Sequence, residues 1–210
     1  IKHLLPNSNV KVVSNPVEIC SKSFLKDDHK NQFIFLGRLH PVKGIGNLIF
    51  NWKKIYDKNK TWELLLIGPD SDGYKDRLIQ EFDLDNQYCN IKFIDSVHGK
   101  EKWEYLSSAK YFVMPSEFEN FGSAIVEGMS AKLPIITTDQ TPWSLIVDVG
   151  CGWIISKNKK LDDILTSAIN LDELKRKEMG DRARSLSHDY STDNVIKGMM
   201  NLYESAIRKV

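Results

Sequence analysis

The sequence has almost no net charge, few cysteines and no long apolar run. Its 210 residues carry a formal net charge of +1, which gives no basis for bulk attraction to nucleic acid. No apolar run approaches the roughly 18 residues that cross a bilayer as a helix. The cysteines lie far apart without CxxC or Cys/His spacing, so we expect plain thiols in a reducing compartment and no metal site; they are Cys20, Cys89 and Cys151.

Two common nucleotide-binding motifs are also missing. The chain contains no glycine–lysine–hydroxyl sequence of the Walker type, and no GxGxxG follows a predicted strand. These absences disfavour a P-loop nucleotide hydrolase and the usual NAD-binding fingerprint. The composition, with 41% hydrophobic and 27% charged residues, is nevertheless that of a globular domain with a buried core.

Apolar runs of strand length alternate with amphipathic stretches of helical length along most of the chain. Strands are predicted at residues 32–37, 62–68, 91–95, 111–115, 134–138 and 152–156. Helices are predicted at residues 45–56, 74–82, 100–108, 122–131, 143–147, 161–170, 172–187 and 192–208. Nearly continuous apolar strands indicate burial on both faces of a sheet. We therefore predict an α/β fold with a Rossmann-like, doubly wound parallel sheet and additional C-terminal helices.

In such a sheet, ligands bind in the loops that leave the carboxyl ends of the strands. The loop after the first strand reads GRLHPVKG and places Arg38 and Lys43 between two glycines, directly before a helix. A forked guanidinium, a point-charge ammonium and a helix N-terminus together suit a diphosphate. The alternative is a pair of solvated surface cations, and His40 in the same loop is expected to be solvated.

The loop after the fourth strand contains two glutamates. Glu119 lies in the loop and Glu127 lies one to one and a half turns into the following helix, so both carboxylates are expected to border one pocket. Carboxylates accept paired hydrogen bonds from the vicinal hydroxyls of a ribose or sugar ring. The backbone N–H groups of Asn120 to Ser123 would point at an anion there. The alternative is a solvated acidic loop in which Glu127 pairs with a lysine, and Glu117 is expected to be a more exposed neighbour.

Weaker signals follow three other strands. Gly68 begins a turn, the segment with Ser96 and Val97 offers backbone groups to a nucleotide base, and residues 138–143 (TDQTPW) offer amides to phosphate. Trp143 is expected to pack as a lid over the core rather than to bind a ligand.

Three stretches of the sequence match a known family in order and spacing. They are VVSNPVE at residues 12–18, FLGRLHPVKGIGNLI at residues 35–49 and PSEFENFGSAIVEGMSAKLPIITTD at residues 115–139. On these motifs the chain resembles, from about Val12 to Tyr203, the C-terminal domain of retaining glycosyltransferases of family 4, which have the two-domain GT-B fold.

The resemblance implies a role for each motif residue. Arg38 and Lys43 would bind the diphosphate of the donor and stabilise the leaving nucleoside diphosphate, while Glu127 would hold the ribose. Glu119 would contact the transferred sugar near the reacting carbon. Backbone groups of the loops would complete the donor site, at Gly37, Ser96, Val97, Asn120, Phe121, Gly122 and Ser123. Enzymes of this kind usually need no metal, so we expect no cofactor beside the nucleotide-sugar.

The sequence departs from the family pattern at three places. Lys132 stands where the family usually has glycine, so either the turn differs or a strained left-handed lysine is tolerated. Gly128 replaces a common alanine, which would loosen the helix or let the backbone approach the ligand. Residues 141–143 (TPW) replace a double glycine and put phosphate contacts there in doubt.

The resemblance also implies the domain organisation. Residues 1–30 would be a lead-in strand and interdomain linker, 31–190 the nucleotide-sugar-binding domain, and 191–210 a crossover helix. The N-terminal, acceptor-binding domain would be absent, so the isolated chain is expected to bind nucleotide weakly and transfer no sugar. The crossover helix would pack on that domain.

The functional hypothesis is a retaining, hexosyltransferase-like enzyme that moves a sugar from a UDP-, GDP- or ADP-linked donor to a saccharide or lipid-linked acceptor. A setting in polysaccharide biosynthesis, in the cytoplasm or at the inner face of the cell membrane, is expected by resemblance. The main alternative is a non-catalytic module that binds nucleotide-sugar, and a GT-B-related epimerase is a third. The sequence leaves base, sugar and acceptor undetermined, because backbone groups recognise the base in this family.

Overall fold

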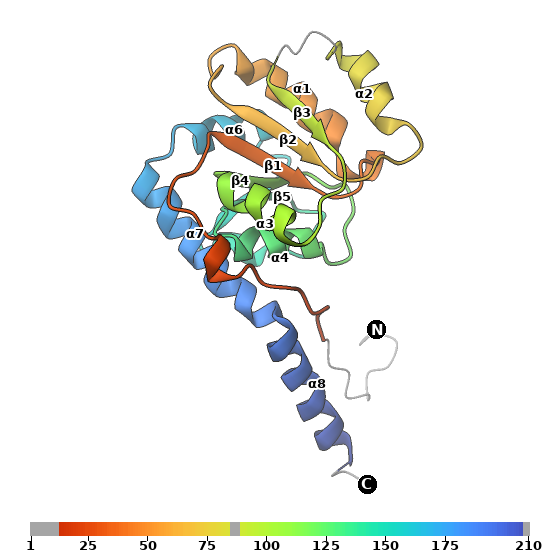
Figure 1. Ribbon diagram of the computed structural model, residues 1–210, viewed down its shortest axis with the longest axis vertical. Helices are drawn as coiled ribbons and strands as arrows, with labels where there is room; N and C mark the ends of the chain where they lie inside the picture. The colour runs from red at the N-terminus through yellow and green to blue at the C-terminus, as the bar shows by residue number, and fades with distance from the viewer. Residues whose placement is uncertain (1–12, 85–88, 208–210) are drawn as a thin grey trace.

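Six parallel strands form the centre of the structure, a computed structural model that describes residues 13–84 and 89–207 (Figure 1). The strands are β1 (Gln32–Leu36), β2 (Glu63–Ile67), β3 (Ile91–Ile94), β4 (Tyr111–Met114), β5 (Ile135–Thr138) and β6 (Gly152–Ile155). Their order across the sheet is β3-β2-β1-β4-β5-β6, and all neighbours are parallel. The predicted Rossmann-like doubly wound sheet is therefore confirmed.

The chain starts the sheet in its middle and adds strands first to one side and then to the other. The direction of winding reverses between β1 and β4, which pair through Phe33–Tyr111 and Ile34–Phe112. In a doubly wound sheet this reversal opens a crevice beyond the carboxyl ends of the two strands, and ligands bind there. The two motif loops predicted to bind the donor are the loops that leave β1 and β4.

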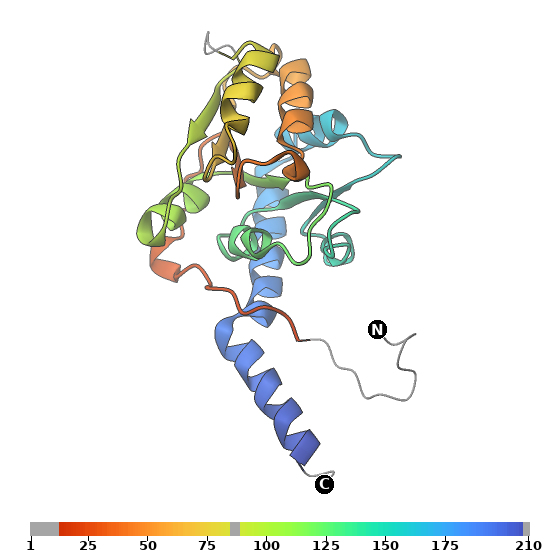
Figure 2. The same ribbon diagram turned by 90° about the vertical axis from the view of Figure 1, so that its right-hand side faces the viewer.

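Both faces of the sheet are covered by helices, as their apolar sequences predict. One layer contains α1 (Ile45–Tyr56), α2 (Tyr74–Phe82) and α6 (Leu161–Ile169); the other contains α3 (Gly99–Ser108), α4 (Ser123–Ser130), α5 (Leu145–Asp148) and α7 (Glu173–Ser187) (Figures 1 and 2). Residues of β1 and β4 are all buried, because each of their side chains meets one of the two layers.

The last helix, α8 (Thr192–Ile207), leaves this body and extends away from it (Figures 1 and 2). It begins at an N-cap serine, since the Ser191 hydroxyl accepts a hydrogen bond from the Asn194 N–H group at 3.4 Å. Apolar side chains at helical spacing stay exposed along one side, at Ile196, Met199, Met200, Tyr203 and Ile207.

The segment before β1 crosses the body close to the start of α8. The Val17 N–H group donates to the Tyr190 carbonyl at 3.0 Å, and Val17 forms a single bridge with Ser191. A short 3₁₀ helix, η1 (Lys22–Phe24), is the only helix in residues 13–30. The lead-in strand expected in this segment falls partly outside the described residues, and the Val17 bridge is the strand-like pairing within residues 13–30.

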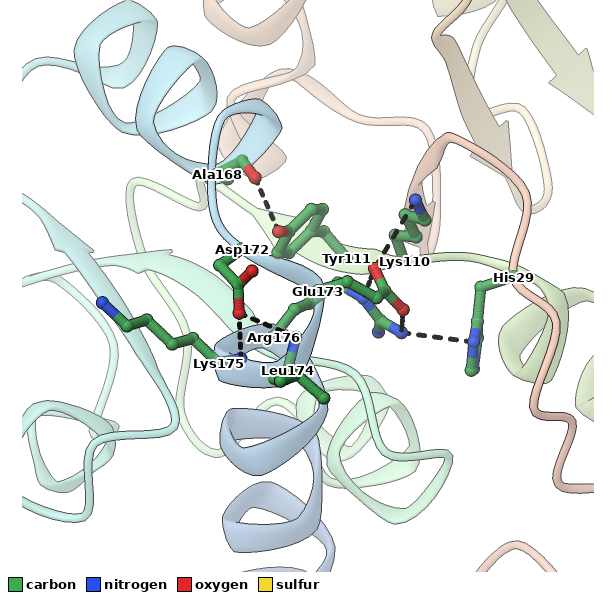
Figure 3. Close-up of polar contacts among 9 residues, drawn as sticks. All are labelled: His29, Lys110, Tyr111, Ala168, Asp172, Glu173, Leu174, Lys175 and Arg176. Carbon is green, nitrogen blue, oxygen red and sulfur yellow. Dashed lines mark hydrogen bonds and ion pairs between the residues drawn. The ribbon is translucent and has the colours of Figure 1, made fainter.

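The segment is further anchored at the N-terminal end of α7, where Arg176 is almost fully buried (Figure 3). Arg176 makes two hydrogen bonds to the Glu173 carboxylate, at 3.1 and 2.7 Å, and a third to His29 Nδ1 at 3.2 Å. The guanidinium and Lys110 hold the pKa of Glu173 well below its usual value, at about 2. Burial, and then the Arg176 charge, lower the pKa of His29.

Two of the sequence departures have a packing explanation. A Cβ atom on Gly128 would lie 2.7 Å from ring atoms of Phe112 in β4, so glycine at this position makes room for a core aromatic side chain. Lys132 does adopt the left-handed conformation, with φ of +64°. Its turn is held by α7, because Gly180 leaves room for the Lys132 carbonyl and Asp181 pairs with the ammonium at 2.7 Å.

Candidate functional site

The loop after β1 is built as a compact turn that leads into α1. His40 caps the 3₁₀ helix η2 (Pro41–Lys43), because its Nδ1 accepts a hydrogen bond from the Val42 N–H group at 3.2 Å. This contact gives His40 a structural role rather than the solvated position expected. Arg38 is exposed, and within the described residues its side chain makes no hydrogen bond or ion pair. Its guanidinium is therefore available to an anion.

The loops after β1 and β4 are joined to each other at three points. A Cβ atom on Gly44 would lie 2.1 Å from the Pro115 carbonyl oxygen, so only glycine permits this approach. The Glu117 N–H group donates to the Val42 carbonyl at 2.9 Å. The Lys43 ammonium forms an ion pair with the Glu119 carboxylate. The two motifs therefore form one continuous structure at the crevice between β1 and β4.

The loop after β4 also presents a row of free backbone donors. Gly122 caps α4 with φ of +78°, a conformation that favours glycine. Within the described residues, none of the N–H groups from Asn120 to Ser123 donates a hydrogen bond. Unpaired N–H groups at a helix N-terminus attract anions and can donate hydrogen bonds to sugar oxygens. The N–H groups from Asn120 to Ser123 are therefore available to a ligand, and their role in donor binding stays a prediction.

A pocket of about 250 Å³ lies beyond the ends of β1, β2 and β3, with one wall formed by α4. It brings together predicted residues from the three loops after β1, β2 and β3, which are Gly37, Gly68, Ser96 and Val97, and Glu127 of α4. Glu119 does not line this pocket, so the expectation that both carboxylates border one pocket is wrong. Glu127 lies inside α4 and faces the β3 side, whereas Glu119 precedes the Gly122 turn and faces the β1 loop.

Lys102 is a pocket residue that sequence reasoning missed. It lies in the first turn of α3, lines the same pocket and pairs with Glu127 at 2.8 Å. The side chains of Lys102 and Glu127 are only 14% and 18% exposed, so the pair is partly shielded from water. The Lys102 ammonium also lies 3.5 Å from the Glu18 carboxylate and 4.3 Å from the centre of the Trp103 ring. The sequence offered one signal for Lys102, which is its position in the first turn of a helix that follows a strand.

The Lys102–Glu127 pair bears on the alternative given for Glu127, a solvated acidic loop in which this carboxylate pairs with a lysine. Its carboxylate does pair with a lysine, but both side chains line the pocket and both keep some exposure. An anion and a diol bound between them would find a cation and a carboxylate side by side. The pairing therefore belongs to the candidate site and does not place Glu127 on a solvated surface. Glu117 is exposed, as expected.

Trp143 packs under the loop that carries Glu119. It is 2% exposed, and its indole N–H group donates to the Phe121 carbonyl. Its ring lies 5.6 Å from that of Phe121 and 5.0 Å from that of Tyr190, while the latter two rings are 5.8 Å apart. We call these three residues the aromatic cluster. Trp143 is packed against the core, as expected, and the cluster connects the loop to the 3₁₀ helix η3 (His188–Tyr190), which follows α7.

The described residues contain neither a metal-binding group of side chains nor a membrane-spanning helix. In residues 13–84 and 89–207 no group of three or more histidine, cysteine and acidic side chains is placed to hold a metal ion. Over the same residues no helix is both long and apolar enough to cross a membrane. The three cysteines are buried, unpaired thiols.

Comparison with known proteins identifies the family. The model for Glycosyl transferases group 1 matches residues 17–186. An uncharacterized glycosyltransferase of Methanocaldococcus jannaschii is 28% identical over 174 residues, which cover 81% of this chain and 47% of the relative. The chain spans about half the length of the first curated relatives it matches, with 47%, 54% and 46% of their residues covered.

Two solved structures illustrate the similarity of fold. TarM of Staphylococcus aureus, solved with fondaparinux, alpha-GlcNAc-glycerol and UDP, matches with a TM-score of 0.76 at 21% identity, covering 96% of this chain and 41% of TarM. The C-terminal domain of the group 1 glycosyl transferase LpcC of Francisella tularensis matches with a TM-score of 0.66 at 22% identity, covering 86% of this chain and 97% of that domain.

The six-stranded sheet is thus that of the GT-B glycosyltransferases. The chain belongs to the Glycosyl transferases group 1 family.

Proposed function

We propose that the chain is the donor-binding half of a retaining family 4 glycosyltransferase that transfers a sugar from a nucleoside diphosphate to an acceptor. The observation that carries the proposal is the junction of the two motif loops, where Lys43 pairs with Glu119 at the crevice between β1 and β4. A diphosphate-binding cation and a sugar-binding carboxylate then lie next to each other, as a nucleotide-sugar requires.

Each part of the donor has a matching part of the site. The diphosphate binds Arg38 and Lys43, whose charges stabilise the leaving nucleoside diphosphate as negative charge develops on it. Ribose binds in the pocket lined by Glu127 and Lys102, with the base beside Ser96 and Val97. The transferred sugar lies against Glu119 and the free N–H groups from Asn120 to Ser123. These charges and N–H groups neutralise the diphosphate, so we propose no metal cofactor.

A second domain is proposed to complete the enzyme. Two observations support it: the chain spans about half of its relatives' length, and α8 leaves apolar residues exposed along one side. An apolar helical face of this kind is stabilised by packing against another structure. We propose that α8 packs on an N-terminal domain that supplies most of the acceptor site.

A cytoplasmic site of action, at the inner face of the membrane, stays a prediction.

A thermal-shift panel tests donor binding. TarM was solved with UDP, which makes UDP the first candidate for this chain. We expect one of UDP, GDP and ADP to raise the melting temperature, and its sugar conjugates to raise it further through Glu119. The Glu127→Ala variant should show a much smaller shift, whereas Glu104→Ala, an exposed carboxylate on α3, should match the wild type. A panel in which no nucleotide or sugar conjugate shifts the transition would exclude the proposal.

The alternative is a module that binds nucleotide-sugar without catalysis. Glu119→Gln in the whole protein separates the two, because transfer depends on the carboxylate beside the reacting carbon and binding of the nucleotide does not. We expect turnover to fall at least ~100-fold while the nucleotide still binds. The anomeric configuration of the product, measured by NMR spectroscopy, tests retention, and an inverted product would contradict that part of the proposal.

A further inference from the structure

A second pocket, of about 330 Å³, borders the loop that carries Glu119 on the side of the aromatic cluster. It is lined by Ser14 and Asn15 of the segment before β1, by Asn120 and Phe121 of the loop, and by Trp143 and Tyr190. Its volume lies within the range of small-molecule sites. It shares no lining residue with the pocket that contains Glu127.

The chemistry of this pocket differs sharply from that of the donor site. No charged side chain lines it, whereas the donor site contains Arg38, Lys43, Lys102, Glu119 and Glu127. A phosphate or another anion would therefore find no cation to pair with there. The lining is instead a mixture of aromatic rings, amides and hydroxyls, which matches a molecule that is polar but uncharged.

The polar groups of the pocket have no partners of their own. Within the described residues, the side chains of Ser14, Asn15 and Asn120 make no hydrogen bond, and neither does the Tyr190 hydroxyl. Tyr190 is half-buried against Phe121 and Trp143, so its ring is held in place while its hydroxyl stays free. A fixed aromatic surface ringed by unpaired donors and acceptors fits a sugar ring, which presents C–H groups on its faces and hydroxyls around its edge.

We propose that this pocket is a subsite for an uncharged saccharide of the acceptor, contributed by the donor-binding half. The inference rests on the proposed function, which puts the transferred sugar at Glu119. Asn120 and Phe121 follow Glu119 directly, so a saccharide in the pocket lies beside the sugar to be transferred. The subsite therefore determines specificity for the acceptor, and Tyr190 and Asn15 are its central residues.

Saturation-transfer difference NMR spectroscopy on the 210-residue chain tests the inference. The probes are maltose, cellobiose and chitobiose, each added after saturation with the nucleotide that gives the largest thermal shift. We expect a signal from at least one disaccharide, reduced by ~5-fold or more in Tyr190→Ala, about the effect of losing one or two contacts. Asn15→Trp, which fills the opening from an exposed position, should reduce the signal equally if Tyr190→Ala proves unstable.

Phe50→Ala serves as the matched control, because it removes an exposed aromatic ring from α1, outside the pocket. Its signal should equal that of the wild type. Equal signals in the wild type and both pocket variants, or no signal from any disaccharide, would overturn the inference. Thermal shifts on the same samples distinguish the two failures. A chain that binds nucleotide but no disaccharide contradicts this subsite alone, and a chain that binds no nucleotide contradicts the proposed function.

Discussion

The ammonium of Lys43 donates a hydrogen bond to the carboxylate of Glu119, although the two residues are 76 positions apart in the chain. Their side chains are only 17% and 15% exposed, so the pair is partly shielded from solvent. Each group thus neutralises the other at the point where the loops after β1 and β4 meet. Under the proposed function, a diphosphate that binds Lys43 would have to compete with this carboxylate, and its binding would free Glu119 for the sugar.

Glu119→Gln should therefore tighten the binding of a nucleoside diphosphate that carries no sugar. Removing the carboxylate leaves Lys43 without its competing anion, and we expect the dissociation constant to fall by about 3–10-fold, which corresponds to the net contribution of one ordinary hydrogen bond. Isothermal titration calorimetry measures the change, with Glu117→Gln in the same loop as the control. Weaker binding in Glu119→Gln would show that Glu119 itself contacts the nucleotide.

The Lys102–Glu127 pair should determine how the site recognises ribose. Lys102→Met removes the cation that holds the Glu127 carboxylate at 2.8 Å, so we expect nucleotide affinity to fall ~5–50-fold. The preference for the ribonucleotide over its 2′-deoxy form should fall with it, because Glu127 loses its fixed position. Lys100→Met is the control, since Lys100 is exposed and pairs only with Glu104 on the same helix within the described residues. An unchanged preference in Lys102→Met would separate Lys102 from the ribose.

Gly128→Ala should destabilise the fold even though alanine is the better helix former. The added Cβ atom would lie 2.7 Å from Phe112, which is fully buried, so the strand and helix must move apart. Overpacking of this kind costs about 1–3 kcal/mol in the free energy of unfolding. Gly198→Ala in α8 is the matched control, because nothing lies within 4 Å of its added Cβ, and it should stabilise by up to about 1 kcal/mol. Urea denaturation compares the two, and equal effects would refute the packing explanation.

His29 should make stability depend on pH near neutrality. Its pKa in the folded chain lies below the ordinary value of 6.5, so the unfolded chain takes up the proton first as the pH falls. The stability that neutral His29 provides is therefore complete above pH 6.5 and is lost as the pH falls through the lowered pKa. The urea midpoint should decrease over this range in the wild type and less in His29→Gln, which keeps an acceptor for Arg176 (Figure 3).

Glu173 makes the stability of the fold depend on pH in a separate, lower pH range. Its pKa of about 2 lies below the ordinary 4.5, so its contribution is kept down to about pH 4.5 and is lost only below it. An identical pH profile in the wild type and His29→Gln between pH 7.5 and 5 would therefore contradict the assignment to His29.

Most of the fold follows from the periodicity of the sequence, and the helices α1 and α2 agree with their predicted bounds residue for residue. The strand runs are apolar throughout because the sheet is covered on both faces, so composition alone predicts them. The topological reversal between β1 and β4 explains why the two best motif loops lie together.

The remaining features depend on pairings that no periodicity encodes. Lys102 is one of several lysines near a helix start, and only the packing of α3 beside α4 brings it to Glu127. Glycine is required at position 128 by the ring of Phe112 in β4, sixteen residues earlier in the chain, and not by a contact within its own helix. The pocket beside the aromatic cluster forms only because the segment before β1 meets the 3₁₀ helix after α7, through Val17 and Tyr190.

Calorimetric titration of Arg38→Ala and Lys43→Ala with the nucleoside diphosphate selected by the thermal-shift panel tests the central claim most directly. Both cations are assigned to the diphosphate, so each variant should lose roughly 1–3 kcal/mol of binding free energy, or about 5–150-fold in the dissociation constant. Lys54→Ala, which removes a cation from the far end of α1, should bind as the wild type does. Unchanged affinity in both Arg38→Ala and Lys43→Ala would contradict the placement of the donor at the crevice between β1 and β4.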